Sequence, residues 1–240
     1  MVLGERCTRA CGFCLVDTRK PLDPEVDVPA RVAEAVARMG LMHAVLTMVA
    51  RDDLADGGMA HVADCVRAIR RRSPLARIET LISDVKGTDS LDVLVDARPD
   101  VLNHNIETVA RLQRAVRPSA GYARSLSVLS RGKAAGLTTK SGIIVGMGET
   151  TAEVEGTLVD LAGIGIDIVT IGQYLRPTTT HLPVARWVEP SEFEHLKKFG
   201  ESLGIGHVES SPLTRSSYHA RESADAAMPS DVQVTKVSVS

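Results

Sequence analysis

The stretch TKSGIIVGMGETTAEVEGTLVDLAGIGIDIVTIGQYL, residues 139–175, holds the pattern that decides the fold. Apolar, β-branched runs at Thr139–Val145 and Ile168–Leu175 enclose a segment with helical spacing at Thr151–Ile164. Two buried strands joined by one helix are typical of a parallel βαβ unit, because parallel strands covered on both faces are apolar along their length. The stretch therefore predicts an α/β fold with a parallel sheet.

The same alternation recurs along the rest of the 240 residues, a length that can bury one substantial core. Further strands are expected at Met1–Gly4, Ala44–Val49, Arg77–Ile82, Val101–Ile106 and His207–Ser210. Further helices are expected at Pro29–Met39, Met59–Arg71, Ser90–Ala97, Glu107–Ala115, Tyr122–Ala135 and Pro190–Leu203. The β/α unit is thus repeated about six times.

A six-unit parallel array can form an open doubly wound sheet or a partial barrel. Polar residues follow nearly every expected strand, at Arg51–Asp53, Asp84, Asn103–Asn105, Gly146–Glu149 and Gln173–Tyr174. One such residue alone is commonly a turn or cap residue, but five sets at one end of a sheet are typical of the rim where barrels bind ligands. We therefore predict a partial (β/α)6 TIM-like barrel.

Three cysteines are closely spaced near the start of the chain, where Cys7, Cys11 and Cys14 form CTRACGFC. Three thiolates in eight residues can hold three corners of a [4Fe-4S] cluster and leave the fourth iron open to a small molecule. Zinc is the weaker alternative, because a closed tetrahedral site needs a fourth ligand and the first histidine is His43. Disulfides are weaker still, and Cys65, in a helical stretch, is expected to be a buried apolar residue.

Composition excludes several classes of function. The net charge of −2 gives no electrostatic reason to expect nucleic acid or a membrane surface as partner. The most apolar stretch, Leu158–Leu175, is interrupted by Asp160 and Asp167, which argues against a membrane span. With no leader expected either, the sequence predicts a soluble cytoplasmic protein.

Several motifs together resemble the lipoyl synthase family of radical S-adenosylmethionine (SAM) enzymes. They are CTRACGFC (7–14), RDDLADGG (51–58), RPDVLNHNIETV (98–109), SGIIVGMGET (141–150), TIGQYLRP (170–177), HLPV (181–184) and RSSYHA (215–220). The spacing of the cysteines is shared by the wider superfamily, whereas HNIETV and RSSY point to this family. The resemblance implies a barrel of the radical SAM type.

The resemblance also implies the chemistry. Cys7, Cys11 and Cys14 would bind a [4Fe-4S] cluster whose open iron chelates SAM, and reductive cleavage of SAM would give a 5′-deoxyadenosyl radical. In the family this radical removes hydrogen from an octanoyl chain on a lysine of a lipoyl carrier domain, and a second [4Fe-4S] cluster donates the sulfur. Implied partners are octanoylated lipoyl carrier domains, of a 2-oxoacid dehydrogenase or the glycine cleavage H protein, and an electron donor such as flavodoxin or ferredoxin.

The SAM-binding residues follow by position. Asn105, Glu107 and Arg124 are expected to contact the ribose hydroxyls and the carboxylate of SAM, although a surface ion pair is an equal alternative for Arg124. The segment that contains Gly146 and Glu149 is expected beside the adenine, with Gln173 and Tyr174 next to it. No pair of catalytic acid and base residues is expected, because the reaction is radical chemistry.

The chain also departs from the family pattern. The cysteine trio of the second cluster would precede Met1, while a serine ligand of that cluster is retained as Ser216 or Ser217, of which we favour Ser217. Met48 and Ala50 replace a hydroxyl and a carboxylate and are expected to weaken SAM binding. We expect a barrel domain at 1–212 with a truncated N-terminus, and the RSSY motif with a flexible tail at 213–240. An edge strand at Val232–Val239 is the alternative for the tail.

This pattern leaves three functions open. The first is a lipoyl synthase-like sulfurtransferase, incomplete as the chain stands. The second is another SAM-cleaving radical enzyme, or half of a two-protein lipoyl synthase. The third is a non-catalytic paralogue that binds lipoyl carrier domains.

Overall fold

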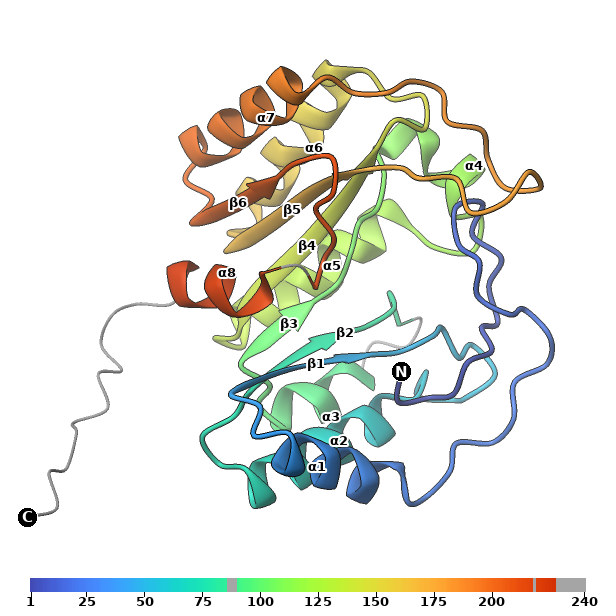
Figure 1. Ribbon diagram of the computed structural model, residues 1–240, viewed down its shortest axis with the longest axis vertical. Coiled ribbons are helices and arrows are strands. Elements are labelled where there is room, and N and C mark those ends of the chain that lie inside the picture. The colour runs from blue at the N-terminus through green and yellow to red at the C-terminus, as the bar shows by residue number, and fades with distance from the viewer. Residues whose placement is uncertain (86–89, 218, 228–240) are drawn as a thin grey trace, which may run out of the picture.

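Six parallel strands form one sheet in the computed structural model, which describes residues 1–85, 90–217 and 219–227 (Figure 1). The strands lie in the order of the sequence, and each pairs in parallel with the next. They are β1 (His43–Thr47), β2 (Arg77–Leu81), β3 (Val101–Asn103), β4 (Thr138–Val145), β5 (Ile168–Gln173) and β6 (His207–Ser210). An unbroken order confirms the partial barrel, because a doubly wound sheet reverses its order at a switch point.

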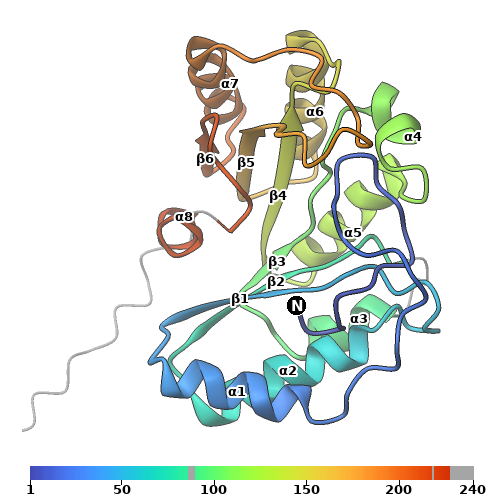
Figure 2. The same ribbon diagram turned by 45° about the vertical axis from the view of Figure 1, so that its right-hand side comes forward.

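The helices cover the outer, convex side of this curved sheet (Figure 2). Right-handed crossovers between successive strands place every connecting helix on the same face, which curves the sheet around its interior. The helices on this side are α1 (Val28–Arg38), α2 (Met59–Arg72), α3 (Ser90–Asp96), α4 (Gln113–Val116), α5 (Tyr122–Ala134), α6 (Thr151–Gly163) and α7 (Pro190–Ser202). The last helix, α8 (Ala220–Ala227), instead lies across the open side, against β1, β5 and β6. No described helix is both long and apolar enough to cross a membrane.

The apolar core lies between strands and helices in two clusters. One forms around β1 to β3 and α1 to α3, and the other around β4 to β6 and α5 to α7. In β4, Ile143 and Val145 belong to the second cluster. Their neighbours Gly142 and Ile144 line a cavity on the inner face instead. The two-residue period of the strand therefore assigns one side to the core and the other to the site.

Two expected elements differ in the structure. Met1–Gly4 is not a strand: the Val2 N–H donates to the Thr47 carbonyl over 2.9 Å, beyond which the chain leaves β1. The helix expected at Glu107–Ala115 is only a 3₁₀ turn, Ala110–Leu112, followed by the short α4. Pro118 explains why α4 ends at Val116, since a proline disfavours helical geometry in the residue before it.

The C-terminal part also differs from expectation. The flexible tail predicted after Arg221 begins instead as α8, which packs against β1, β5 and β6. Asp225 of this helix forms an ion pair with Arg77 of β2. The edge strand considered at 232–239 lies outside the described residues, and the domain boundary at 212 stays a prediction.

Candidate active site

A cavity of about 270 Å³ opens at the carboxyl ends of β4 and β5. Residues from five segments line it: Phe13 of the cysteine loop, Asn105 and Glu107 after β3, Gly142–Ile144 of β4, Thr170 and Gly172–Leu175 in and after β5, and Thr214–Ser216 after β6. In parallel barrels this rim is the place where ligands bind. The fold thus brings the cysteine loop, the HNIET segment and the RSS segment to one place.

Glycine is required where the cavity wall is closely packed. A Cβ atom at Gly142 would lie 2.8 Å from Asn105 Oδ1 and 3.0 Å from Thr170 Oγ1. A Cβ at Gly172 would collide with the main-chain carbonyl of Thr214. Both glycines therefore allow the neighbouring segments to approach the inner face of the sheet.

The segment after β3 has an unusual backbone at the cavity wall. Glu107 has a φ of +66°, in the left-handed region that residues with a side chain rarely adopt. Its N–H donates to Gly142 O over 2.9 Å, and its carbonyl accepts from the Ile144 N–H over 2.8 Å. These bonds to β4 hold the strained residue in place, which is common at functional sites.

Glu107 and Asn105 present polar groups to the cavity. Burial raises the pKa of Glu107, while the Arg117 charge and a hydrogen bond from Asn105 oppose that shift. Asn105 Nδ2 donates to Ser216 Oγ over 3.1 Å, but its Oδ1 is buried without a hydrogen-bond partner. A buried acceptor at a cavity wall is costly unless a ligand or water pairs with it, so Asn105 is suited to accept from a bound hydroxyl or amine.

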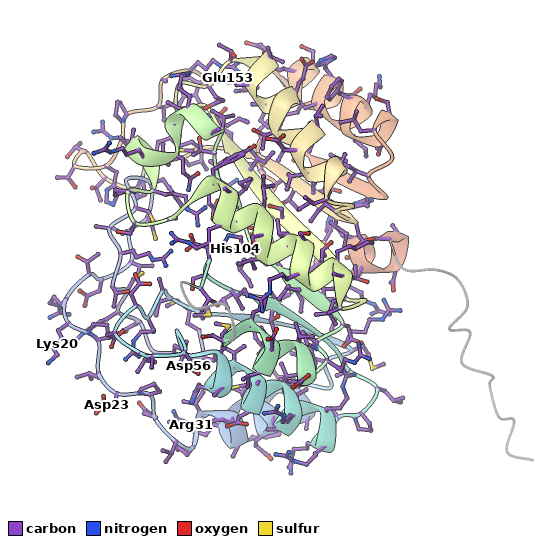
Figure 3. All side chains as sticks on the ribbon, turned by 180° about the vertical axis from the view of Figure 1, so that it is seen from behind. Lys20, Asp23, Arg31, Asp56, His104 and Glu153 are labelled. Atoms are coloured by element: carbon purple, nitrogen blue, oxygen red, sulfur yellow. The ribbon has the colours of Figure 1, made fainter. Side chains whose placement is uncertain are left out.

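The side chains of Asn103–Asn105, predicted together at the rim, lie on different faces of the sheet. His104 is buried outside the sheet, where Nδ1 donates to Ile82 O and Nε2 accepts from Ser125 Oγ, both over 2.8 Å. Figure 3 shows it from behind, beside α5. Burial lowers its pKa to about 4, so the ring is neutral and structural. Asn103 instead donates to the buried carboxylate of Glu79 over 2.7 Å.

The cysteine loop is held by main-chain hydrogen bonds to distant segments. The Gly12 N–H donates to Val116 O at the end of α4 over 2.9 Å, and the Leu182 N–H donates to Gly12 O over 3.0 Å. His181 Nε2 donates to Cys14 O over 3.1 Å. In Figure 1 this loop, in dark blue, accordingly lies beside α4 and the orange segment that follows β5.

The three thiols interact with one another. Burial raises the pKa of Cys11 to about 11, and the charges of Arg117, Cys14 and Cys7 modify it. Burial likewise raises the pKa of Cys14, with a further increase from Cys7. Such thiols deprotonate readily only with a cationic partner, as in a metal site. Among the described residues no three His, Cys, Asp or Glu side chains converge as they would around a single metal ion.

A buried ion-pair network braces the same loop, and it includes Arg9, which sequence reasoning missed. Arg9 donates to Asp52 through Nε and Nη2, both over 2.8 Å, and it also pairs with the fully buried Asp84. Asp84 accepts from Arg124 Nε over 2.7 Å and from the Gly121 N–H over 2.9 Å. This network had a signal in the sequence: an arginine stands between two of the cysteines, and aspartates follow two of the strands.

The structure does not bring every predicted SAM contact to the cavity. Arg124 pairs with the fully buried Asp84, so its ion pair is not the surface pair considered as the alternative, and it does not line the cavity. Glu149 accepts from the N–H groups of Gly146 and Met147 and so closes the turn after β4. Gly146, with a φ of +99°, permits that turn. The roles of Arg124, Gly146 and Glu149 in SAM binding remain predictions.

Gln173 and Tyr174 do line the cavity, and both also organise the segment that covers the cysteine loop. Gln173 Nε2 donates to Arg186 O over 3.2 Å, and its Oε1 accepts from the Val188 N–H over 3.0 Å. The Tyr174 hydroxyl donates to Leu182 O over 2.8 Å. Their side chains thereby fix the loop between β5 and α7 at the rim.

The remaining predicted positions lie as follows. Ser216 lines the cavity, whereas Ser217 is exposed. Met48 packs against the core cluster of β1 to β3, and the Ala50 carbonyl accepts from the Thr8 N–H over 3.0 Å. Sequence reasoning did not single out Phe13, Thr170, Thr214 or Arg215 as lining residues.

The fold and the three-cysteine loop define a class, the radical SAM proteins. The family model described as the radical SAM superfamily matches residues 1–161, which is more than half of the chain. Within that class, a lipoyl synthase of Rubrobacter xylanophilus is 54% identical over 228 residues, covering 94% of this chain and 71% of the relative. A lipoyl synthase of Chlorobaculum tepidum is 53% identical over 223 residues, covering 92% and 77%. The chain belongs to the lipoyl synthase family.

Solved structures agree on the fold. The FeFe-hydrogenase maturase HydG from Carboxydothermus hydrogenoformans matches with a TM-score of 0.68 at 16% identity, over 94% of this chain and 55% of that one. Streptococcus suis SuiB bound to S-adenosylmethionine matches with a TM-score of 0.67 at 9% identity, over 88% and 48%. At these identities the likeness shows the barrel alone. Family membership shows an enzyme, a radical SAM sulfurtransferase that uses SAM and a [4Fe-4S] cluster.

Proposed function

We propose that Cys7, Cys11 and Cys14 hold the [4Fe-4S] cluster and that SAM occupies the cavity lined by Asn105 and Glu107. The carrying observation is that Phe13, between two of the cysteines, forms part of the wall of that cavity. The three half-buried thiols interact electrostatically and offer the donor set of a cluster with one open iron. When bound, the cluster supplies the electron that cleaves the carbon–sulfur bond of SAM.

The protein's own residues bind and shield the reactants. Glu107 can accept hydrogen bonds from ribose hydroxyls, and the unpaired Asn105 Oδ1 can accept one more. Gly142 and Gly172 let a flat adenine approach the backbone of β4 and β5. Phe13 and Tyr174 help to exclude water from a site that must protect a radical.

The substrate proposed for this site is an octanoyl chain on a lysine of a lipoyl carrier domain, as the family name of the relatives suggests. Leu175 lines the cavity and is 46% exposed, and Leu213, 72% exposed, precedes the lining residue Thr214. Such apolar side chains at the rim suit an aliphatic chain that enters from outside. A flavodoxin or ferredoxin is proposed as the electron donor.

Ser217 is proposed as the serine ligand of the second, sulfur-donating cluster. The hydroxyl of Ser216 already accepts a hydrogen bond from Asn105, whereas Ser217 is exposed. Replacement of Ser217 by Ala should then lower the yield of lipoyl product without lowering SAM cleavage. Loss of product in a Ser216→Ala protein alone would reassign the ligand.

Anaerobic reconstitution tests the cluster assignment. The wild-type protein should bind iron and sulfide and produce 5′-deoxyadenosine from SAM under reducing conditions, whereas Cys11→Ala should lose both properties. Cys65→Ala is the matched control, because Cys65 is buried in α2 away from the site and should leave both unchanged. Equal cluster content in the Cys11→Ala and wild-type proteins would contradict the proposal.

A further inference from the structure

Arg117 is a buried cation next to the proposed cluster and SAM sites. It directly follows α4 and is only 7% exposed. Nη1 donates to the carbonyls of Asn105 and Ile106, over 3.1 and 3.0 Å, so the guanidinium binds main-chain oxygens rather than a carboxylate. An arginine stays charged when buried, and this charge acts on the nearby carboxyl group of Glu107.

The two carbonyls belong to the residues that lead into Glu107, whose backbone is in the left-handed region. A residue in that region is strained, and it persists only where the surroundings hold it. Arg117 holds the chain on one side of this turn, and the bonds of Glu107 to Gly142 and Ile144 hold it on the other. The side chain thereby determines how Asn105 and Glu107 face the cavity.

The same guanidinium acts on the cysteine loop. Its charge lies close enough to interact with both Cys11 and Glu107. The residue before it, Val116, accepts the hydrogen bond from the Gly12 N–H. The loop and the cation are therefore held in a fixed relation to each other.

We propose that Arg117 is a positioning residue that sets the Asn105–Glu107 turn and, through its permanent charge, raises the reduction potential of the cluster held by the cysteine trio. This inference rests on the proposed function. Potentials of iron–sulfur clusters depend on nearby charge and hydrogen bonding, and a cation stabilises the reduced, more negative form.

Three variants separate charge from shape. Arg117→Lys keeps the charge, Arg117→Gln keeps a donor but loses the charge, and Arg114→Gln is a matched control on the exposed side of the same short helix. The measurement is a redox titration of the reconstituted cluster, followed by electron paramagnetic resonance without SAM. Arg117→Gln should have a lower midpoint potential than wild type, while Arg117→Lys and Arg114→Gln should keep it.

Calorimetric titration with SAM tests the positioning role. Arg117→Gln should weaken SAM binding about tenfold, a change of about 1.4 kcal/mol, and Arg114→Gln should not change it. If Arg117→Gln does not fold, Glu107→Gln tests the same electrostatic effect on the reduction potential with a charge of the opposite sign. Glu107 faces Cys11 and Cys14 with a negative charge, so its removal should raise the potential.

The outcomes separate this inference from the proposed function. If the wild-type protein binds no cluster, the proposed function fails and the inference fails with it. If every variant binds a cluster and Arg117→Gln or Glu107→Gln shows the wild-type potential, only the role of Arg117 is overturned.

Discussion

The main-chain N–H of Leu182 donates to the carbonyl of Gly12 over 3.0 Å, which ties the loop after β5 to the middle of the cysteine motif. The Gly12 N–H also donates to the Val116 carbonyl, so the main chain of this one residue joins three segments that are far apart in the sequence. The geometry of the cysteine trio thus depends on residues well outside it.

Gly12 should tolerate no larger residue. A Cβ there would lie 2.7 Å from the Cγ and Cδ1 atoms of Leu182, so Gly12→Val should push the two segments apart. We expect less iron per chain after reconstitution and faster cluster loss in air. Gly156→Ala is the control, because nothing lies within 4 Å of a Cβ at that helical position. A Gly12→Val protein with wild-type iron content would show that the close contact between Gly12 and Leu182 is not needed for cluster binding.

Gly142 should control the affinity for SAM. Its replacement by Ala places a methyl group 2.8 Å from Asn105 Oδ1, which displaces the side chain that we assign to SAM. We expect the dissociation constant for SAM to rise about tenfold, with an unchanged iron content. Equilibrium binding to the reconstituted protein checks this, and unaltered affinity would argue that SAM lies elsewhere.

Asp84 should be the most costly carboxylate to remove. Its side chain is fully buried and accepts hydrogen bonds from Arg9, Arg124 and the Gly121 N–H. Asp84→Ala leaves the buried Arg9 with Asp52 alone and removes the carboxylate that pairs with Arg124, so the free energy of unfolding should fall by about 3–5 kcal/mol.

Urea denaturation of the cluster-free protein measures that loss. Asp92→Ala is the matched control, because the Asp92 side chain is 65% exposed and its pair with Arg131 should contribute less than about 1 kcal/mol. Similar losses in both proteins would show that the buried network does not brace the loop.

His104 should make stability depend on pH. Its pKa in the folded protein is about 4, below the ordinary value of 6.5, because burial disfavours the charged ring. The unfolded chain therefore binds a proton that the folded one does not between those values. This contribution is complete above pH 6.5 and is lost as the pH falls toward about 4, by up to about 1.4 kcal/mol per pH unit.

Denaturation at a series of pH values checks this prediction. His104→Asn removes the titrating ring and should flatten the slope between pH 6.5 and about 4 relative to wild type. His195→Asn is the control, because His195 is exposed on α7 and pairs with Glu155 at the surface. An unchanged slope in His104→Asn would assign the pH dependence to other groups.

Much of the fold could be predicted from the sequence because buried parallel strands are apolar along their length. β6 was predicted at His207–Ser210, where it lies, and β4 begins one residue before its predicted start. Two helices were harder: the helix expected from Glu107 begins only at Gln113, as α4, and α8 is held by tertiary contacts with β1, β5 and β6. A polar, small-residue helix of this kind has little local signal.

The site was predictable only in part, for a related reason. Asn105, Glu107, Gln173 and Tyr174 line the cavity as expected, because position at a strand end determines the rim on which a residue lies. Arg124 and Glu149 lie on the same rim but find other partners, Asp84 and the turn at Gly146. Which partner a charged side chain takes depends on the packing of distant segments, and that also concealed Arg9 and Arg117.

The helix α8 has a mechanical consequence. It contacts both β1 and β6, the two edge strands of the array, and Asp225 pairs with Arg77 of β2. Because α8 contacts both edge strands, it holds the two edges of the curved sheet at a fixed separation. The width of the barrel, and with it the distance across the cavity, should therefore depend on a short segment outside the cavity lining.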